Sequence, residues 1–148
     1  MENHRRIVAL VVLMVSSLPA TATEQLPKAI VLDGPAIITA FEGKTVSGAY
    51  ASGLAVSETY ALGGGISYWD PNSTTTGKWS VVNNLLCTFY DNMEGGCFRI
   101  ERLSQNCFDY FALADSEEEA LNPSGKPRYT ARAAIDGAPS TCPDELAV

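Results

Sequence analysis

Four cysteines constrain how this chain can fold more than any other feature of its sequence. They are Cys87, Cys97, Cys107 and Cys142, so all of them lie in the second half of the 148 residues. An even number of cysteines in an exported chain indicates disulfides, because oxidising compartments form and preserve such bonds. Metal binding by thiolates is the competing interpretation, but these cysteines lack the short paired spacing of zinc sites. We therefore expect two disulfides and no free thiol.

The amino-terminal segment supports export. Two arginines are followed by an apolar run over residues 7–15 and then by the small-residue sequence Ala20-Thr21-Ala22, which is the layout of a secretory signal peptide. A membrane anchor needs roughly 20 apolar residues, about twice the length of this run. We expect a signal peptide over residues 1–22, which leaves residues 23–148 as one small disulfide-bonded domain. The expected location is the periplasm or the cell exterior, with no stable membrane insertion after cleavage.

After the leader, the sequence predicts one short helix followed by strands. Asp33-Gly34-Pro35 provides a capping side chain and a first-turn proline, and Gly43 is a suitable end, so we expect a helix over 35–42. Farther on, short segments of β-branched and aromatic residues alternate with Gly, Asn and Asp. The expected strands are 45–50, 57–61, 66–69, 78–82, 85–90, 97–103, 107–113 and 128–135. One helical turn is expected at 116–119.

Short strands at this regular spacing predict a mainly β fold. The expected fold is a small antiparallel barrel or sandwich of six to eight strands, with a short N-terminal helix after the signal peptide. Closure into a barrel would remove the sheet edges through which β proteins aggregate. The strand pattern fits a barrel and a sandwich equally well.

The predicted strands favour one of the three possible disulfide connectivities. A hairpin that turns at 91–96 would place Cys87 opposite Cys97, whereas Cys97 and Cys107 would lie far apart along the next hairpin. Cys87 and Cys107 would lie on strands two apart, beyond the roughly 7 Å between Cα atoms that a disulfide spans. The expected pairs are Cys87–Cys97 and Cys107–Cys142, and the second would hold the C-terminal segment in place.

Part of the sequence resembles a known group of proteins. The segments that carry the resemblance are Gly77-Lys78-Trp79-Ser80-Val81, Leu86-Cys87 and Cys97-Phe98-Arg99-Ile100. They resemble the pattern G-x-W-x-V, L-C and C-[FY]-x-[IV] of small exported proteobacterial domains of unknown function. The preceding helix, with its Gly-Lys-Thr step at 43–45, is also similar to those domains. The resemblance covers roughly Asp33 to Cys142, implies a lipocalin-like or similar small β fold, and carries no known activity.

Groups that could catalyse a reaction are few. The only histidine, His4, lies in the expected signal peptide, so the mature chain would lack a Ser-His-Asp triad, a Cys-His dyad and any His-ligated metal site. Carboxylate pairs are the remaining route to catalysis without histidine. The visible acidic run, Glu117-Glu118-Glu119, fits a solvated surface better than an active site. We expect a protein that is not an enzyme and that needs no cofactor and no metal.

Aromatic side chains are the best candidates for a binding site. Tyr60, Tyr68, Trp69 and Trp79 gather around a glycine-rich region and could contact a ligand or a partner. Strict alternation in the strand 66–69 would place Tyr68 on one face and Trp69 on the other.

Two hypotheses for the function follow. The formal net charge of −7 opposes binding to nucleic acids, because phosphate groups would be repelled. The leading hypothesis is an exported, non-catalytic binding or interaction module with an unknown protein partner, for example an inhibitor-like protein of the cell envelope. The alternative is a lipocalin-like carrier of a small hydrophobic ligand.

Overall fold

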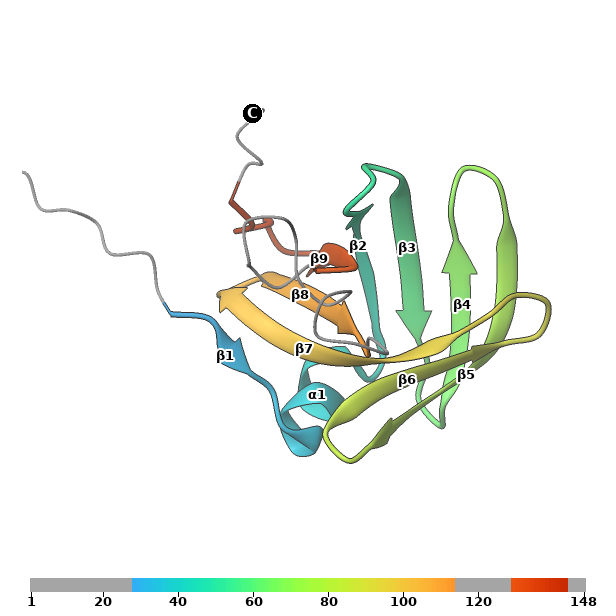
Figure 1. Ribbon diagram of the computed structural model, residues 1–148, viewed down its shortest axis with the longest axis horizontal. Helices are drawn as coiled ribbons and strands as arrows, with labels where there is room; N and C mark the ends of the chain where they lie inside the picture. The colour runs from blue at the N-terminus through green and yellow to red at the C-terminus, as the bar shows by residue number, and fades with distance from the viewer. Residues whose placement is uncertain (1–27, 114–128, 144–148) are drawn as a thin grey trace, which may run out of the picture.

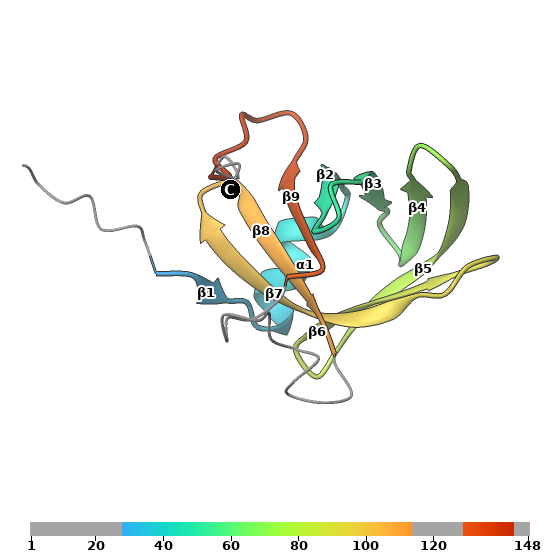
Figure 2. The same ribbon diagram turned by 45° about the horizontal axis from the view of Figure 1, so that its top comes forward.

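A computed structural model describes residues 28–113 and 129–143, which form nine strands and one helix. In chain order the elements are β1 (Ile30–Val31), α1 (Gly34–Phe41), β2 (Lys44–Tyr50), β3 (Ala55–Tyr60), β4 (Gly65–Trp69), β5 (Thr74–Val82), β6 (Leu85–Tyr90), β7 (Gly96–Ser104), β8 (Cys107–Ala112) and β9 (Ala131–Ile135). Strands β2 to β9 pair antiparallel with their neighbours in sequence, and β9 pairs back onto β2. The predicted mainly β fold is confirmed as a closed eight-stranded barrel, shown in Figures 1 and 2.

Strand β1 is an addition to the barrel that the sequence did not predict. It pairs with β7 at Arg102 and Glu101, beyond the part of β7 that pairs with β6. A strand of two residues gives no alternation to recognise in a sequence, which explains the omission. Strands β3 and β5 also begin earlier than expected, at Ala55 and Thr74.

Helix α1 lies where the sequence predicts it, but it begins and ends one residue earlier than the expected 35–42. The Asp33 side chain accepts a hydrogen bond from the backbone N–H of Ala36 at 2.9 Å, as expected of an N-cap residue. After the helix, Gly43 has a φ of 72°, in the left-handed region that glycine adopts without strain. A hydrogen bond of 2.8 Å from Gly34 N–H to the side-chain oxygen of Asn84 ties the helix to the β5–β6 turn.

The helix lies at one end of the barrel, which we call the closed end (Figure 2). Ile37 and Phe41 are completely buried there. The Phe41 ring packs against the rings of Phe108 and Tyr60, with centroids 5.1 Å and 5.5 Å away. Burying one such side chain contributes about 1.5–3 kcal/mol, so the helix stabilises the barrel by filling it. The opposite end, reached by the turns at 51–54, 70–73 and 91–95, is called the open end.

Alternation along each strand divides the side chains between the barrel interior and its outer wall. In β4, Tyr68 is 4% exposed and points inward, whereas Trp69 is 48% exposed on the wall. The predicted opposition of Tyr68 and Trp69 is therefore confirmed. Trp79 points inward as well, and its indole N–H donates to the carbonyl oxygen of Ala61 at 3.0 Å.

Both predicted disulfides are present, and no cysteine is free. Cys87 and Cys97 are direct partners in the β6–β7 register, with Cα atoms 4.0 Å apart. Cys107 and Cys142 have Cα atoms 4.8 Å apart and hold the segment after β9 against β8. A register shift between Arg102 and Ser104 in the β7–β8 hairpin places Cys107 opposite Ser104.

Several predictions concern residues outside the described ranges. These are the signal peptide at 1–22 with His4, the helical turn at 116–119 with its glutamates, and the first residue of the last strand, Arg128. In the described part of the chain, the last strand starts at Ala131.

Candidate binding site at the open end of the barrel

The four aromatic residues that the sequence singled out do not form one site. Tyr60 and Trp79 belong to the packed interior, with ring centroids 5.4 Å apart in an edge-to-face arrangement. Tyr68 also points inward, but it lies at the open end, where it meets polar side chains. Trp69 stands apart on the outer wall. Of the four predicted contacts, only Tyr68 and the hydroxyl group of Tyr60 take part in the cluster described next.

A carboxylate inside the barrel is the centre of this cluster. Glu58 lies on β3 at an inward position, two residues from Tyr60 along the strand. The hydroxyl group of Tyr60 donates to one oxygen of Glu58, and that of Tyr90, on β6, donates to the other. Two strands separate β3 from β6 in the sheet, so the contact crosses the interior. Both carboxylate oxygens are thus held by neutral donors.

A second chain of hydrogen bonds lies beside the first. The hydroxyl group of Tyr50 donates to that of Tyr68 at 3.2 Å, and Tyr68 donates to the Asp70 carboxylate at 2.6 Å. Asp70 in turn accepts the backbone N–H groups of Asn72 and Ser73, each at 2.7 Å, which fixes the β4–β5 turn. The rings of Tyr68 and Tyr90 meet edge to face with centroids 5.3 Å apart, which links the two chains.

A further hydroxyl group at the base of the cluster has no partner. Tyr110 is 5% exposed and lies on β8, and no group of the described residues hydrogen-bonds its hydroxyl oxygen. Burial raises the pKa of Tyr110, and the nearby Glu58 charge raises it further. A buried polar group without a hydrogen bond is destabilising and rare in folded proteins. Among the described residues, the Tyr110 hydroxyl is therefore a buried group at the base of the cluster whose oxygen could still accept a hydrogen bond.

The environment of the cluster shifts the pKa values of its members. Burial raises the pKa of Glu58, and the hydrogen bonds from Tyr60 and Tyr90 offset part of that effect. The pKa of Asp70 is lowered, first by the Tyr68 hydroxyl and then by backbone N–H groups. Burial also raises the pKa of Tyr68 and of Tyr90. At neutral pH the tyrosines are neutral donors, and the charge that the cluster can carry is negative.

No basic side chain of residues 28–113 and 129–143 pairs with these carboxylates. The two ion pairs found there are Arg99–Glu101, at 2.9 Å, and Arg132–Asp109, at 2.7 Å. Arg132 and Asp109 are partners in the β8–β9 register and point outward, because their neighbours Ala131 and Tyr110 point inward. Both pairs lie on the outer wall, so they do not compensate the carboxylates inside.

A glycine explains how Tyr90 is positioned. Gly77 is the register partner of Tyr90, and a Cβ atom at Gly77 would lie 2.0 Å from the carbonyl oxygen of Phe89. Strands β5 and β6 can approach this closely only because position 77 has no side chain. Gly77 is the first residue of the G-x-W-x-V segment, and its role there is to allow this contact.

Most residues of this cluster were not predicted from the sequence. Tyr50, Glu58, Asp70, Tyr90 and Tyr110 were not among the candidates. One signal was available: Val56, Glu58 and Tyr60 alternate along β3, so a strand face that carries buried residues at 56 and 60 also carries the carboxylate. That signal needs the correct start of β3, which the prediction placed two residues too late.

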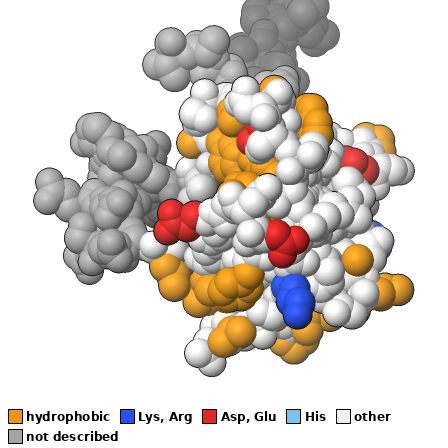
Figure 3. All heavy atoms as spheres, turned by 90° about the vertical axis from the view of Figure 1, so that its right-hand side faces the viewer, with side chains coloured by type: hydrophobic (Ala, Val, Ile, Leu, Met, Phe, Trp, Pro, Cys, Tyr) orange, Lys and Arg blue, Asp and Glu red, His pale blue; other side chains and the backbone are white. Residues whose placement is uncertain are grey.

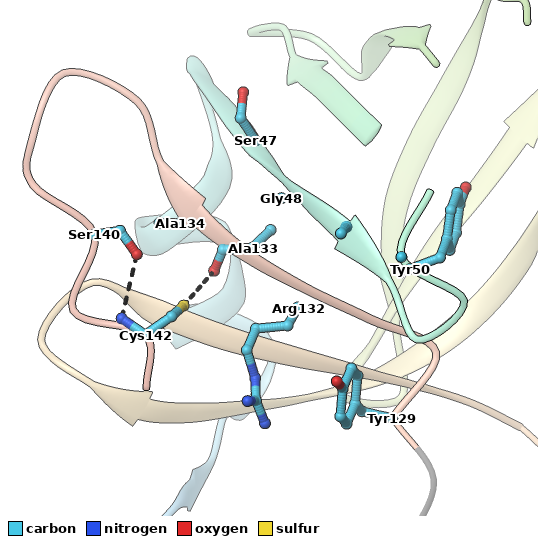
Figure 4. Close-up of a pocket in the computed structure, with 11 residues that line it drawn as sticks. Ser47, Gly48, Tyr50, Tyr129, Arg132, Ala133, Ala134, Ser140 and Cys142 are labelled. Atoms are coloured by element: carbon cyan, nitrogen blue, oxygen red, sulfur yellow. Dashed lines mark hydrogen bonds between the residues drawn. The ribbon is translucent and has the colours of Figure 1, made fainter. Parts of the chain in front are cut away.

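In the part of the chain that the structure describes, the outer wall offers shallow hollows but no comparable group of polar side chains. The hollow in Figure 4 has a volume of about 260 Å³ and lies between β2, β9 and the segment that carries Cys142. Its one charged side chain, Arg132, already bonds Asp109 and packs its guanidinium 4.5 Å from the centre of the Tyr129 ring. The wall around β4 and β5 carries few charges (Figure 3). On β2 and β3, the hydroxyl groups of Thr45 and Thr59 hydrogen-bond each other at 2.8 Å.

Comparison with known proteins adds no relative. No protein-family model matches the chain, and no curated protein matches its sequence. Within the part of the chain that the structure describes, no helix has the length and apolar character needed to cross a membrane. The same residues contain no group of three or more His, Cys, Asp or Glu side chains that could hold a metal ion.

Proposed function

We propose that this protein is an exported, non-catalytic binding module and that the open end of its barrel is the binding site. The observation that carries the proposal is the Glu58 carboxylate, which lies inside the barrel with hydrogen bonds from Tyr60 and Tyr90 and no basic partner among the described residues. A charged group in a protein interior destabilises the fold unless it is paired. Because an unpaired interior carboxylate does not stabilise the fold, we attribute Glu58 to the recognition of a ligand or a partner.

Export is supported by the covalent structure. Two disulfides are compatible with an oxidising compartment, and the leader sequence and the resemblance to exported proteobacterial domains point the same way. In a cell envelope, a binding module of this kind would act on a protein partner or on a small molecule.

The absence of catalysis is part of the proposal. A carboxyl group with a raised pKa can serve as a general acid, and Glu58 has that property. Both of its oxygens, however, are engaged by tyrosine hydroxyl groups, and a general acid must have its proton within reach of a substrate. Recognition of a partner does not require proton transfer from Glu58.

A lipocalin-like carrier of a hydrophobic ligand is the alternative function. The barrel is compatible with it, but aromatic side chains fill the closed end and the open end is lined with hydroxyl and carboxylate groups. Organic extraction of the protein purified under native conditions, followed by mass spectrometry, tests the alternative directly. A stoichiometric lipophilic molecule would favour the carrier.

The leading proposal is tested by capture with two matched variants. The protein is expressed from its full sequence, purified from the exported fraction, immobilised, and exposed to an envelope extract at low salt. Tyr50→Ala alters an aromatic residue at the open end, whereas Trp69→Ala alters one on the outer wall. We expect the wild type and Trp69→Ala to retain the same component and Tyr50→Ala to lose it. Equal capture by all three proteins, or loss with Trp69→Ala alone, would contradict binding at the open end.

A further inference from the structure

We propose that the open end of the barrel binds an organic ammonium group, either a free alkylamine or the side chain of a lysine on a partner. The inference rests on the proposed function and names the chemistry that the site recognises. It follows from three properties of the cluster: its charge, its aromatic rings and its unpartnered hydroxyl group.

Charge is the first property. Glu58 and Asp70 are the two carboxylates of the cluster, and Glu58 is the one that lies between tyrosine hydroxyl groups. Neither takes part in an ion pair with the described residues, whereas Glu101 and Asp109 on the outer wall each have an arginine partner. A cation entering the open end would therefore meet negative charge without first displacing a basic side chain of residues 28–113 or 129–143.

Aromatic rings are the second property. Tyr68 donates to Asp70, and Tyr90 donates to Glu58. Tyr50 is joined to Tyr68 through their hydroxyl groups, and the rings of Tyr68 and Tyr90 stand at 64° to each other. Tyrosine rings attract ammonium groups through their negatively charged faces, and cages of such rings with a nearby carboxylate suit alkylated ammonium ions. A metal cation would instead require several oxygen ligands of the carboxylate or carbonyl type, and the described residues contain no such group of acidic side chains.

The third property is the Tyr110 hydroxyl group. Its oxygen is buried and accepts no hydrogen bond from a described residue, and it lies beside Tyr60, which donates a hydrogen bond to Glu58. The oxygen could accept a hydrogen bond from an N–H group of a primary ammonium. A quaternary ammonium has no N–H to donate, so this hydroxyl would favour primary over quaternary amines. Access is compatible with the proposal, because Glu58, Tyr50 and Tyr90 each keep part of their surface exposed.

Binding of simple probes tests the proposal. The exported protein is titrated with choline, with its uncharged analogue 3,3-dimethyl-1-butanol and with n-butylamine, and binding is followed by tyrosine resonances in NMR spectra and by calorimetry. We expect both cations to bind and the uncharged alcohol to bind at least about tenfold more weakly, since a charge pair near a protein surface contributes more than the 1.4 kcal/mol that a tenfold change requires. Equal binding of choline and its uncharged analogue would overturn the proposal.

Two variants test whether the cation binds inside the barrel. Glu58→Gln removes the interior charge and keeps the size of the side chain, whereas Glu42→Gln removes an exposed charge at the closed end, next to α1. We expect Glu58→Gln to weaken n-butylamine binding at least about tenfold, by the same charge argument, and Glu42→Gln to leave it unchanged. Equal effects of the two variants would show that only net charge matters and would contradict a site inside the barrel.

The source of the ammonium group is resolved by a second pair of probes. A short lysine-containing peptide and the same peptide acetylated on the lysine side chain are compared with n-butylamine. Binding of the lysine peptide alone indicates a protein partner, and binding of the small amines alone indicates a free amine. If no probe binds but capture from the extract still depends on Tyr50, the open end binds a ligand of another class and only the present inference fails.

Discussion

The hydroxyl group of Tyr90, on β6, donates a hydrogen bond to the carboxylate of Glu58, on β3, across the inside of the barrel. The two residues are 32 positions apart in the chain. They meet because closure of the barrel turns the inward faces of β3 and β6 toward each other. The stability of the fold is thereby coupled to the protonation of one interior carboxyl group.

The first prediction is that Glu58 makes stability depend on pH. Its pKa in the folded protein is raised above the ordinary value of 4.5, chiefly by burial. The folded state therefore binds the proton more tightly than the unfolded state does, so Glu58 contributes most to stability below pH 4.5 and loses that contribution as pH rises through the folded pKa. Urea unfolding from pH 4 to pH 8 should show wild type losing stability relative to Glu58→Gln, by at most about 1.4 kcal/mol per pH unit. Parallel curves for the two proteins would contradict the prediction.

The second prediction concerns Tyr90→Phe. The substitution removes one of the two hydrogen bonds that lower the pKa of Glu58, so that pKa should rise further. We expect a loss of about 1–3 kcal/mol of unfolding free energy at pH 7, because a buried carboxylate loses a donor. A double-mutant cycle measures the coupling, and the loss should be smaller when residue 58 is already glutamine. Additive losses would mean that the Tyr90 hydroxyl group stabilises the protein independently of the Glu58 carboxylate.

The third prediction concerns the different solvent exposure of the two tryptophans. Trp69 is 48% exposed on the wall, whereas Trp79 is 6% exposed inside the barrel. In the Trp79→Phe protein the remaining fluorescence comes from Trp69, and acrylamide should quench it strongly. In the Trp69→Phe protein the emission comes from Trp79 and should be quenched several-fold less. Similar quenching of both variants would show that Trp79 is accessible, which would favour an open interior of the lipocalin type.

Local patterns in the sequence predicted much of this fold. Asp33 and Gly43 set the ends of the helix through capping and a positive φ, and both act within a few residues. The Cys87–Cys97 pair followed from the position of one hairpin turn. Alternation placed Tyr68 and Trp69 on opposite faces. Each of these inferences needs only neighbouring residues.

The site itself depends on relationships that no local pattern contains. Glu58 receives Tyr90 only because β9 pairs with β2 and closes the barrel, and the strand pattern did not distinguish a barrel from a sandwich. Whether a glutamate on a strand faces solvent or the interior is likewise decided by closure. Tyr60 and Tyr68 were predicted as individual aromatic contacts, but Tyr90 and the carboxylate that Tyr60 and Tyr90 share were not.

The fourth prediction compares the two disulfides. In the chain-entropy model, a loop of 10 residues stabilises by about 3 kcal/mol and one of 35 residues by about 4 kcal/mol. Replacing Cys107 and Cys142 by alanine should therefore lower the unfolding free energy more than replacing Cys87 and Cys97. It should also increase hydrogen exchange in the segment after β9, because Cys142 attaches that segment to β8. If both double replacements lowered the unfolding free energy equally, and hydrogen exchange after β9 did not increase, hydrogen bonds alone would hold that segment.

Those hydrogen bonds give the last prediction, which concerns Asn106. Its side-chain NH₂ group donates to the carbonyl oxygens of Ile135, Pro139 and Ala138 at 3.0, 3.2 and 3.4 Å, and its oxygen accepts the N–H of Ile135 at 2.8 Å. Asn106 is 7% exposed. In Asn106→Asp a carboxylate would replace the donor and face three carbonyl oxygens, which should destabilise the protein by about 3 kcal/mol or more at pH 7.

The pH dependence of this loss distinguishes charge repulsion from a change of shape. Burial among carbonyl oxygens raises the pKa of a carboxyl group, so the folded variant should take up a proton as pH falls and regain a donor. The destabilisation should therefore shrink between pH 7 and pH 4 in urea unfolding experiments. Asn92→Asp, an exposed change of the same chemistry, is the control and should stay within about 0.5 kcal/mol of wild type. A loss for Asn106→Asp that is the same at both pH values would mean that the segment after β9 is held by shape and by Cys142, and not by these donors.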